Sequence, residues 1–413
     1  MRKRKYMFLL SGAAIASMIT VPFTVMAEDD VVELNYYTWY QSADGSYPAN
    51  MIESFEEKYP NIKINLEVGS QNVDEYLELQ KVKLLSGKDI DVTSVRSESY
   101  SSYVDAGYLM DTTNEDFMKN YKDDYKNMIT INDACYGIPY AMDVYGCIYN
   151  KTMFEENGWK VPFNYQEFQK LCDTISEAGI TPTVQGYKDS WPLAQDIELF
   201  MNKAVVDDPE IYDKIEKGEA KYTDPEFVDI MTKMNDFFHS SAISDMDMAM
   251  TYDQSAAYFA SGQAAMLMHG EWILDSIKSA EPDFEIGICP APLNDEGEDQ
   301  RGVVAITSVQ GIASSTEHPE EAKLFLDYMS SQEAAKLMDQ SMGNFTAVSG
   351  IESEKLTPWE SVLDLPSTDF CTDYMYTGVS SEMYKAAQQM IADEITPEQM
   401  CQAMQDAQDK KES

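Results

Sequence analysis

The stretch CYGIPYAMDVYGCIYNKTMFEENGW, from Cys135 to Trp159, combines a turn, a strand-like run and a single carboxylate in its first half. Gly-Ile-Pro at 137–139 predicts a turn, and the apolar run Val144–Tyr149 predicts a strand. Asp143 stands between them, among tyrosines and aliphatic residues. Because burial of an unpaired carboxylate is costly, Asp143 must be exposed or have a polar partner. The residues leave open a solvated turn residue, a catalytic group and a hydrogen-bond acceptor for a ligand.

Length and composition indicate a large acidic globular protein. The chain has 413 residues, of which 44% are hydrophobic, and this is enough for two domains. It carries 72 Asp and Glu against 30 Lys and Arg, a formal net charge of −42. This excess of negative charge argues against nucleic acid and anionic membranes as partners, and it favours a neutral or cationic small ligand.

The first 27 residues predict a secretory signal peptide that is not part of the fold. They contain four basic residues near the start, a long apolar segment and the small-x-small ending Val25-Met26-Ala27, so we expect cleavage after Ala27. An uncleaved anchor helix is the alternative. No cysteine lies at the cleavage point, so no lipid anchor is expected. The mature protein is therefore expected outside the cytoplasm, in a periplasm or at the cell exterior.

The cysteines and histidines do not form a metal-binding pattern. Six cysteines are widely spaced without a CxxC pair, and there are three histidines. We therefore expect no zinc site, no other metal and no cofactor. Buried free thiols and one or more disulfides both remain open.

The order of predicted elements indicates an α/β fold. Residues 31–37, 62–68 and 90–95 have strand patterns, whereas 49–59 and 73–85 have helical spacing. This β-α-β-α-β order favours a sheet with helices on its faces. Further elements are predicted at 165–178, 253–265, 272–279 and 318–330 (helices) and at 284–288 and 303–309 (strands), with a small-residue turn at His269-Gly270.

Five sequence blocks, in order along the chain, resemble a known family. They are Trp39–Gly45, Phe55–Ile64, Ser86–Val92, three segments within Tyr136–Trp159, and Phe259–Met266 followed by Gly270-Glu271-Trp272. In these blocks the chain resembles the extracellular solute-binding proteins of ABC importers, carbohydrate type, the group that includes maltose-binding protein. One departure is Ile90, which stands where the family usually has proline.

The resemblance implies a periplasmic-binding-protein-like fold of type II, with two discontinuous α/β lobes joined by hinge strands. The N-terminal lobe would comprise 28–142 plus 303–348, and the C-terminal lobe 143–302 plus 349–413. A mono- or oligosaccharide would bind between the lobes and pass to a membrane ABC permease. The protein would act as a monomer and not as an enzyme.

Sugar binding requires acceptors for hydroxyl groups and flat apolar surfaces for the C–H faces of the rings. Carboxylates accept strong charge-assisted hydrogen bonds, and aromatic side chains supply rigid flat area. Positions of both kinds fall where the family contacts its ligand. The ligand-binding residues predicted on this basis are Trp39, Asp44, Glu98, Tyr140, Asp143, Trp191 and Trp272.

Each of these residues also has a structural alternative. The aromatic residues Trp39, Tyr140 and Trp191 are equally consistent with core packing. Glu98 is consistent with a solvated helix start, or with an ion pair to Arg96. The neighbour of Trp272, Glu271, is expected to be a surface or helix-start charge.

Two other functions remain open from the sequence. The same fold can bind a peptide, a polyamine or a metal, although three histidines argue against a transition metal. A secreted glycoside hydrolase would use two carboxylates, for which Asp143 and Glu98 are the available pair. A hydrolase would leave the five family blocks unexplained, and neither a Gly-rich phosphate loop nor a GxSxG motif is present.

Overall fold

The computed structural model describes residues 31–40, 47–70, 73–189, 191–341, 345–353, 355–368, 375 and 377–411. The predicted signal peptide and Asp44 lie outside these ranges. Within them, none of the helices has the length and apolar character needed to cross a lipid bilayer.

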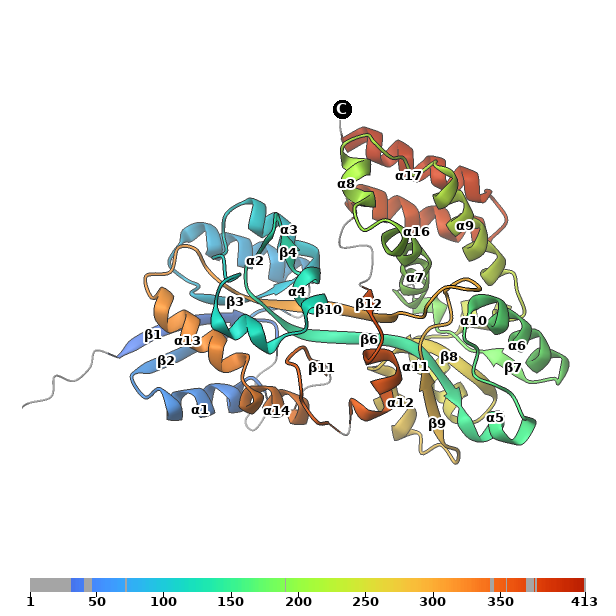
Figure 1. The fold of residues 1–413 in the computed structure, drawn as a ribbon, viewed down its shortest axis with the longest axis horizontal. Helices are drawn as coiled ribbons and strands as arrows, with labels where there is room; N and C mark the ends of the chain where they lie inside the picture. Colours follow the sequence, from blue (N-terminus) through green and yellow to red (C-terminus); the bar gives the residue numbers. More distant parts are fainter. Residues whose placement is uncertain are drawn as a thin grey trace, which may run out of the picture.

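A mixed sheet of ten strands connects the two ends of the described molecule (Figure 1). Its main order is β2-β1-β3-β10-β6-β8-β7, with β9 and β11 paired to β6 and β12 paired to β10. The strands are β1 (Val32–Thr38), β2 (Ile62–Val68), β3 (Val92–Arg96), β6 (Ile138–Asn150), β7 (Thr181–Thr183), β8 (Ala264–Gly270), β9 (Ile286–Cys289), β10 (Gly302–Ile312), β11 (Phe345–Thr346) and β12 (Ser367–Thr368). A separate hairpin consists of β4 (Thr130–Ile131) and β5 (Ala134–Cys135).

The long strands β6 and β10 cross between two lobes (Figure 1). They pair antiparallel from Ile138 opposite Gln310 to Tyr145 opposite Val303. On its other edge, β10 pairs with β3 through Ser308–Ile312, whereas Tyr145–Asn150 of β6 pairs with β8 and β9. Each strand therefore belongs to the sheet of both lobes, and together they form the hinge that the family resemblance implied.

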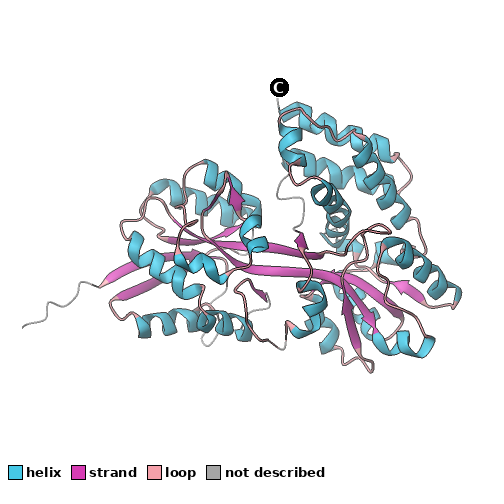
Figure 2. Cartoon of the chain, viewed as in Figure 1, coloured by secondary structure: helices cyan, strands magenta, loops and turns pink. Residues whose placement is uncertain are grey.

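Helices cover the strands in both lobes, as Figure 2 shows. Those of the first lobe are α1 (Ala49–Lys58), α2 (Val73–Ser86), α3 (Ser97–Asp105), η1 (Asp116–Asn120), α4 (Asp123–Met128), α13 (Pro319–Met329) and α14 (Gln332–Ser341). Those of the second lobe are α5 (Lys151–Asn157), α6 (Tyr165–Glu177), η2 (Tyr187–Asp189), α7 (Trp191–Asp207), α8 (Ile211–Glu216), α9 (Pro225–Phe238), α10 (Asp245–Ala249), α11 (Tyr252–Ala260), α12 (Ile273–Ser279), η3 (Thr357–Trp359), α15 (Glu360–Leu363), α16 (Thr377–Ile391) and α17 (Pro397–Lys411).

Two groups of buried apolar side chains lie on opposite faces of the sheet in the second lobe. Along β6, Ile148 belongs to one group and its neighbour Cys147 to the other. This follows from strand geometry, because successive side chains point to opposite faces. The group containing Ile148 continues through Val144 and Val304 into the first lobe. The crossing strands therefore share a continuous core with both lobes along one face.

The first five predicted elements are confirmed, with ends shifted by up to two residues. The prediction of a helix at 253–265 is wrong at its end, because α11 stops at Ala260 and β8 follows. Strand β8 was not predicted, since all seven of its residues are buried and it shows no polar alternation. The turn expected before Asp143 is also wrong. Strand β6 starts at Ile138, and Asp143 lies in its middle.

The five cysteines within the described ranges are free thiols and are buried. Cys147 on β6 and Cys289 on β9 are paired in register. The sixth cysteine, Cys371, lies outside the described residues. Burial raises the pKa of the Cys172 and Cys401 thiols, to about 12 for Cys401. At neutral pH these two cysteines are therefore uncharged members of the core.

Gly137, immediately before β6, allows a close approach to β10 that no other residue permits. Its φ is +150°, and a Cβ there would lie 2.4 Å from the Gln310 carbonyl oxygen. We expect Gly137→Ala to lower the free energy of unfolding by about 1–3 kcal/mol, because the new methyl group would push the two crossing strands apart. Urea unfolding followed by tryptophan fluorescence measures this change.

Gly158 provides the matched control. It also has positive φ, +69°, but a Cβ at this position would have nothing within 4 Å of it among the described residues. Gly158→Ala is expected to cost only the conformational penalty, about 1 kcal/mol. An equal or smaller loss for Gly137→Ala would contradict the steric argument.

Candidate functional site

Trp272 lies where β8 ends and α12 begins, directly against the backbone of Gly270. A Cβ at Gly270 would lie 1.9 Å from Cζ3 of the Trp272 indole. Only glycine at this position lets the ring lie over the chain. The turn therefore fixes the orientation of Trp272, which remains half-buried.

Trp272 is part of a group of four rings that we call the aromatic wall, consisting of Trp191, Tyr252, His269 and Trp272. The Trp191 ring centroid lies 5.2 Å from that of Tyr252 and 5.4 Å from that of His269. Trp272 lies 5.1 Å from His269 and 6.3 Å from Trp191. Trp191 is 40% exposed. The wall thus joins residues from α7, α11, β8 and α12, and it presents flat aromatic area to solvent.

His269 is the buried, uncharged member of the aromatic wall. It is 2% exposed, and its Nδ1 accepts a hydrogen bond from the Gly270 amide at 2.9 Å. The ring proton is therefore on Nε2, for which no acceptor exists among the described residues. Burial lowers the His269 pKa to about 3. The wall consequently carries no positive charge at neutral pH.

Asp143 and Glu271 form an acid pair beside the aromatic wall. The Val144 amide donates to Oε2 of Glu271 at 2.8 Å, and the Glu271 amide donates to the Val144 carbonyl at 3.0 Å. Burial, and then the charge of Asp143, raise the Glu271 pKa well above its usual range. Oε1 of Glu271 has no hydrogen-bond partner among the described residues. Glu271 therefore favours its protonated form at neutral pH.

The position of Glu271 corrects the sequence-based expectation. We expected a surface charge at a helix start, but the residue is 5% exposed. The reason is the pairing of β6 with β8, which brings Tyr145 opposite Gly270 and so puts Glu271 next to Val144. Asp143 itself is half-buried and faces Ala305 of β10 in the strand register.

The first lobe contributes a second aromatic group near the acid pair. At the end of β1, the Trp39 ring lies 4.9 Å from Tyr40 and 5.2 Å from the Arg96 guanidinium, which stacks over it. Burial raises the Tyr40 pKa, and the nearby charges of Asp143 and Arg96 also act on it. Trp39, Arg96 and Asp143 are therefore grouped around Tyr40, so groups from both lobes meet at β6.

Of the remaining predicted ligand-binding residues, Tyr140 is buried, and the side chains of Glu98 and Asp44 are not described. Tyr140 is 3% exposed, with its ring 6.0 Å from Tyr40 and 6.1 Å from Tyr47. It packs beneath the site, so a ligand contact by Tyr140 stays a prediction. Glu98 lies in the first turn of α3, but its side chain is outside the described structure. Asp44 is likewise not described.

A buried carboxyl group, Asp196, supports the aromatic wall from behind. The Tyr145 and Tyr187 hydroxyls each donate to it at 2.5 Å. The Tyr145 ring in turn stacks on His269, with centroids 6.3 Å apart. Burial raises the Asp196 pKa to about 7, although the two hydrogen bonds act in the opposite direction. The Asp196 carboxyl group, with a pKa of about 7, therefore contacts the aromatic wall through Tyr145.

The site can bind and orient a ligand through flat rings and one acidic acceptor. In the described part of the chain, no group of three or more His, Cys, Asp or Glu side chains is arranged to hold a metal ion. The structure places the predicted residues Trp191 and Trp272 in one aromatic group and Asp143 near Glu271, and it adds Tyr252 and His269, which the sequence analysis did not predict. The sequence near Tyr252 indicates only where α11 begins, through the capping box at Thr251. It does not indicate that Tyr252 packs against the two tryptophans.

Comparison with known proteins agrees with this architecture. The family model for bacterial extracellular solute-binding proteins matches residues 38–336. The multiple sugar-binding protein of Streptococcus mutans is 26% identical over 348 residues, which cover 83% of this chain and 81% of that protein. The chain therefore belongs to the bacterial extracellular solute-binding protein family.

Solved structures share the same two-lobed fold. The apo-form of RafE from Streptococcus pneumoniae has a TM-score of 0.76 at 23% identity, covering 93% of this chain and 99% of RafE. RafE in complex with raffinose has a TM-score of 0.69 at 22% identity, covering 92% and 100%.

The first prediction for the site concerns Asp196. Its folded-state pKa of about 7 lies above the ordinary aspartate value of 3.8, so the folded state holds the proton more tightly than the unfolded state. This contribution to stability is fully present below about pH 4 and is lost as the pH rises through 7. Wild type should therefore lose roughly 2–3 kcal/mol between pH 5 and pH 8 relative to Asp196→Asn. Urea unfolding at both pH values measures the difference. An identical pH dependence in both proteins would refute it.

The second prediction concerns Glu271. Because the folded protein holds Glu271 protonated, folding of the wild type at pH 7 requires proton uptake, whereas folding of Glu271→Gln does not. We expect Glu271→Gln to have the higher free energy of unfolding at pH 7, with the gain shrinking as the pH falls toward the ordinary range of glutamate. Glu271→Ala, which leaves the Val144 amide unpaired, should lose about 1–3 kcal/mol. A destabilised Glu271→Gln at pH 7 would show that Glu271 is ionised.

Proposed function

We propose that this protein captures a mono- or oligosaccharide between its two lobes and delivers it to a membrane ABC permease. The observation that carries the proposal is the aromatic wall beside the acid pair, at the strands that cross between the lobes. Flat rings match the C–H faces of a sugar, and an ionised Asp143 matches its hydroxyl groups. The name of the Streptococcus mutans relative, a multiple sugar-binding protein, supports the same class of ligand.

Capture by closure of the lobes is the mechanism that fits this arrangement. A sugar that contacts both lobes binds the closed form better and shifts the population toward it. The chain has a higher TM-score with the apo-form of RafE than with its raffinose complex, 0.76 against 0.69. This difference supports an open arrangement of the two lobes.

The rest of the proposal concerns processing and organisation. We propose that the mature chain begins after Ala27, carries no lipid anchor and acts as a monomer outside the cytoplasm. Its lobes would be 28–142 plus 303–348 and 143–302 plus 349–413. Of the three boundaries, 142/143 falls within β6, 302/303 within β10, and 348/349 shortly after β11. The permease would recognise the closed form.

Binding without catalysis is also part of the proposal. A glycoside hydrolase needs its two carboxyl groups about 5 to 10 Å apart, flanking the bond to be cleaved. The acidic side chains that the described structure brings together here are Asp143 and Glu271, and the charge of Asp143 raises the Glu271 pKa. A pair in which one member favours its protonated form beside the other supports binding rather than cleavage in this proposal. Incubation with the bound oligosaccharide should return it intact.

Titration calorimetry against raffinose, maltotriose, spermidine and a tripeptide tests the ligand class. We expect a sugar to bind and the other two classes to give no heat. Trp272→Ala should weaken sugar binding about tenfold or more, because one stacking surface is lost. X-ray scattering should show a smaller radius of gyration when the sugar is bound.

Trp159→Ala is the matched control variant. Trp159 packs against Phe154 of α5, and Figure 1 shows α5 at the far end of the second lobe. Its loss should leave sugar affinity unchanged. Tight binding of spermidine instead of a sugar, or equal effects of the two tryptophan variants, would refute the proposed ligand or the proposed site.

A further inference from the structure

A second pocket lies in the second lobe, away from the aromatic wall. It is formed by α7, α9 and the segment 291–303, and it has a volume of about 390 Å³, within the range of small-molecule sites. Asn202, one of its lining residues, lies eleven residues after Trp191 on α7. At about 1.5 Å per residue this corresponds to roughly 16 Å along the helix axis. The pocket is therefore separate from the candidate sugar site.

The lining of this pocket is mainly apolar. Its apolar members come from both helices, from the 291–303 segment and from the start of β10. They include Leu199, Phe200, Ile230, Ala291, Leu293 and Val303. A polyol in such a pocket would leave most of its hydroxyl groups facing carbon, which is unfavourable. The lining therefore favours a ligand with an apolar body.

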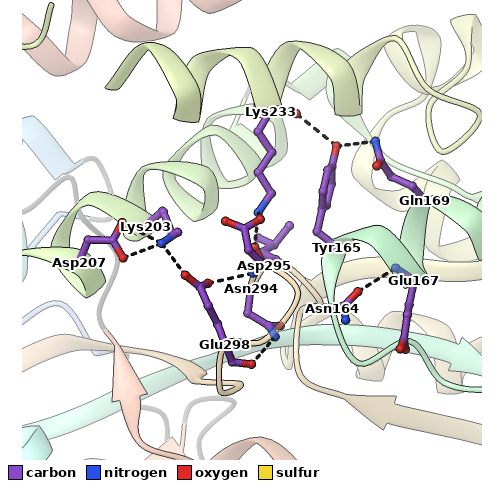
Figure 3. A network of polar contacts seen from close by, with 11 residues as sticks. Asn164, Tyr165, Glu167, Gln169, Lys203, Asp207, Lys233, Asn294, Asp295 and Glu298 are labelled. Atoms are coloured by element: carbon purple, nitrogen blue, oxygen red, sulfur yellow. Dashed lines mark hydrogen bonds and ion pairs between the residues drawn. The ribbon is translucent and has the colours of Figure 1, made fainter. Parts of the chain in front are cut away.

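The two lysines that line the pocket are paired with carboxylates (Figure 3), whereas Asp299 and Arg301, which also line it, have no ion pair among the described residues. Lys203 lies 2.5 Å from Asp207 and 2.9 Å from Glu298. Lys233 lies 2.7 Å from Asp295 and donates to the Leu293 carbonyl at 2.6 Å. These bonds fix the segment 291–303 on α7 and α9. A charged ligand would have to compete with these pairs, whereas a neutral ligand would leave them intact.

The pocket also contains an amide group that the protein leaves unpaired. Asn202 is 4% exposed, and neither its Oδ1 nor its Nδ2 has a hydrogen-bond partner within the part of the chain that is described. Oδ1 of Asn294 is unpaired in the same way, while its Nδ2 donates to the Glu298 carbonyl at 3.1 Å. Buried polar groups are normally hydrogen-bonded. A ligand that offers an acceptor and a donor side by side would satisfy the Asn202 amide.

We propose that this pocket binds a neutral small molecule with an apolar body and one amide-like edge. The Asn202 amide would pair with that edge through one donated and one accepted hydrogen bond. The apolar lining would cover the body of the ligand, and the paired lysines would form its rim. This site is independent of sugar capture, since it shares no residue with the aromatic wall or the acid pair.

The test uses benzamide as the probe and methyl-labelled full-length mature protein observed by NMR. Benzamide should shift the methyl signals of Ile230 and Leu293 in a saturable way. N,N-dimethylbenzamide lacks the donor and benzoate is charged, so both should bind at least fivefold more weakly. Addition of sugar should not change the chemical shifts of the Ile230 and Leu293 methyl groups.

Two pocket variants and one site variant make the result specific. Asn202→Leu keeps a similar volume and removes the unpaired amide, so it should fold at least as stably as wild type and lose benzamide binding. Ala291→Leu places a larger side chain in the pocket from the segment 291–303, so it should also reduce benzamide binding. Trp272→Ala should bind benzamide like wild type even though it loses sugar.

Three results would overturn the proposal. These are the absence of benzamide shifts in wild type, unchanged benzamide binding by Asn202→Leu, and equal binding of benzamide and N,N-dimethylbenzamide. The first result would mean that the Asn202 amide is satisfied by water. Trp272→Ala is measured in parallel. The absence of benzamide binding can therefore be distinguished from the absence of sugar binding.

Discussion

The antiparallel pairing of β6 with β10 is the constraint on which the two lobes and the candidate site depend. Because both strands belong to the sheets of both lobes, any movement of one lobe against the other must pass through them. The acid pair is attached to the same frame, since Glu271 exchanges backbone and side-chain hydrogen bonds with Val144 of β6. A ligand that contacted Asp143 would therefore contact the hinge itself.

The electrostatics of the site differ from those of the whole chain. A formal net charge of −42 would suggest a strongly anionic cleft. At the site, however, Glu271 is held protonated, His269 is held neutral, and Arg96 stacks on Trp39 near Asp143. The candidate site is therefore less anionic than the net charge of the chain suggests, which suits the proposed neutral polyol better than a polycation.

The sequence was sufficient to predict the strands and helices whose two faces differ in polarity. Strands such as β2 alternate in burial, so their pattern can be read directly. Strand β8 is buried on both faces and resembled the end of a helix. Trp191 and Trp272 were predicted as ligand-binding residues, but their contact through His269 depends on tertiary pairing. The same pairing buries Glu271, and nothing in its local sequence indicates this.

The unpaired Nε2–H of His269 has a consequence for how the protein responds to its surroundings. Solute-binding proteins of this family work outside the cell, where acidity is set by the medium. An ordinary histidine would become a cation in a mildly acidic habitat, and its charge would alter the electrostatics of the rings around it. Here a pKa of about 3 keeps the imidazole uncharged. Acidification of the medium would therefore leave the charge of His269 unchanged, so that histidine does not act as a pH switch.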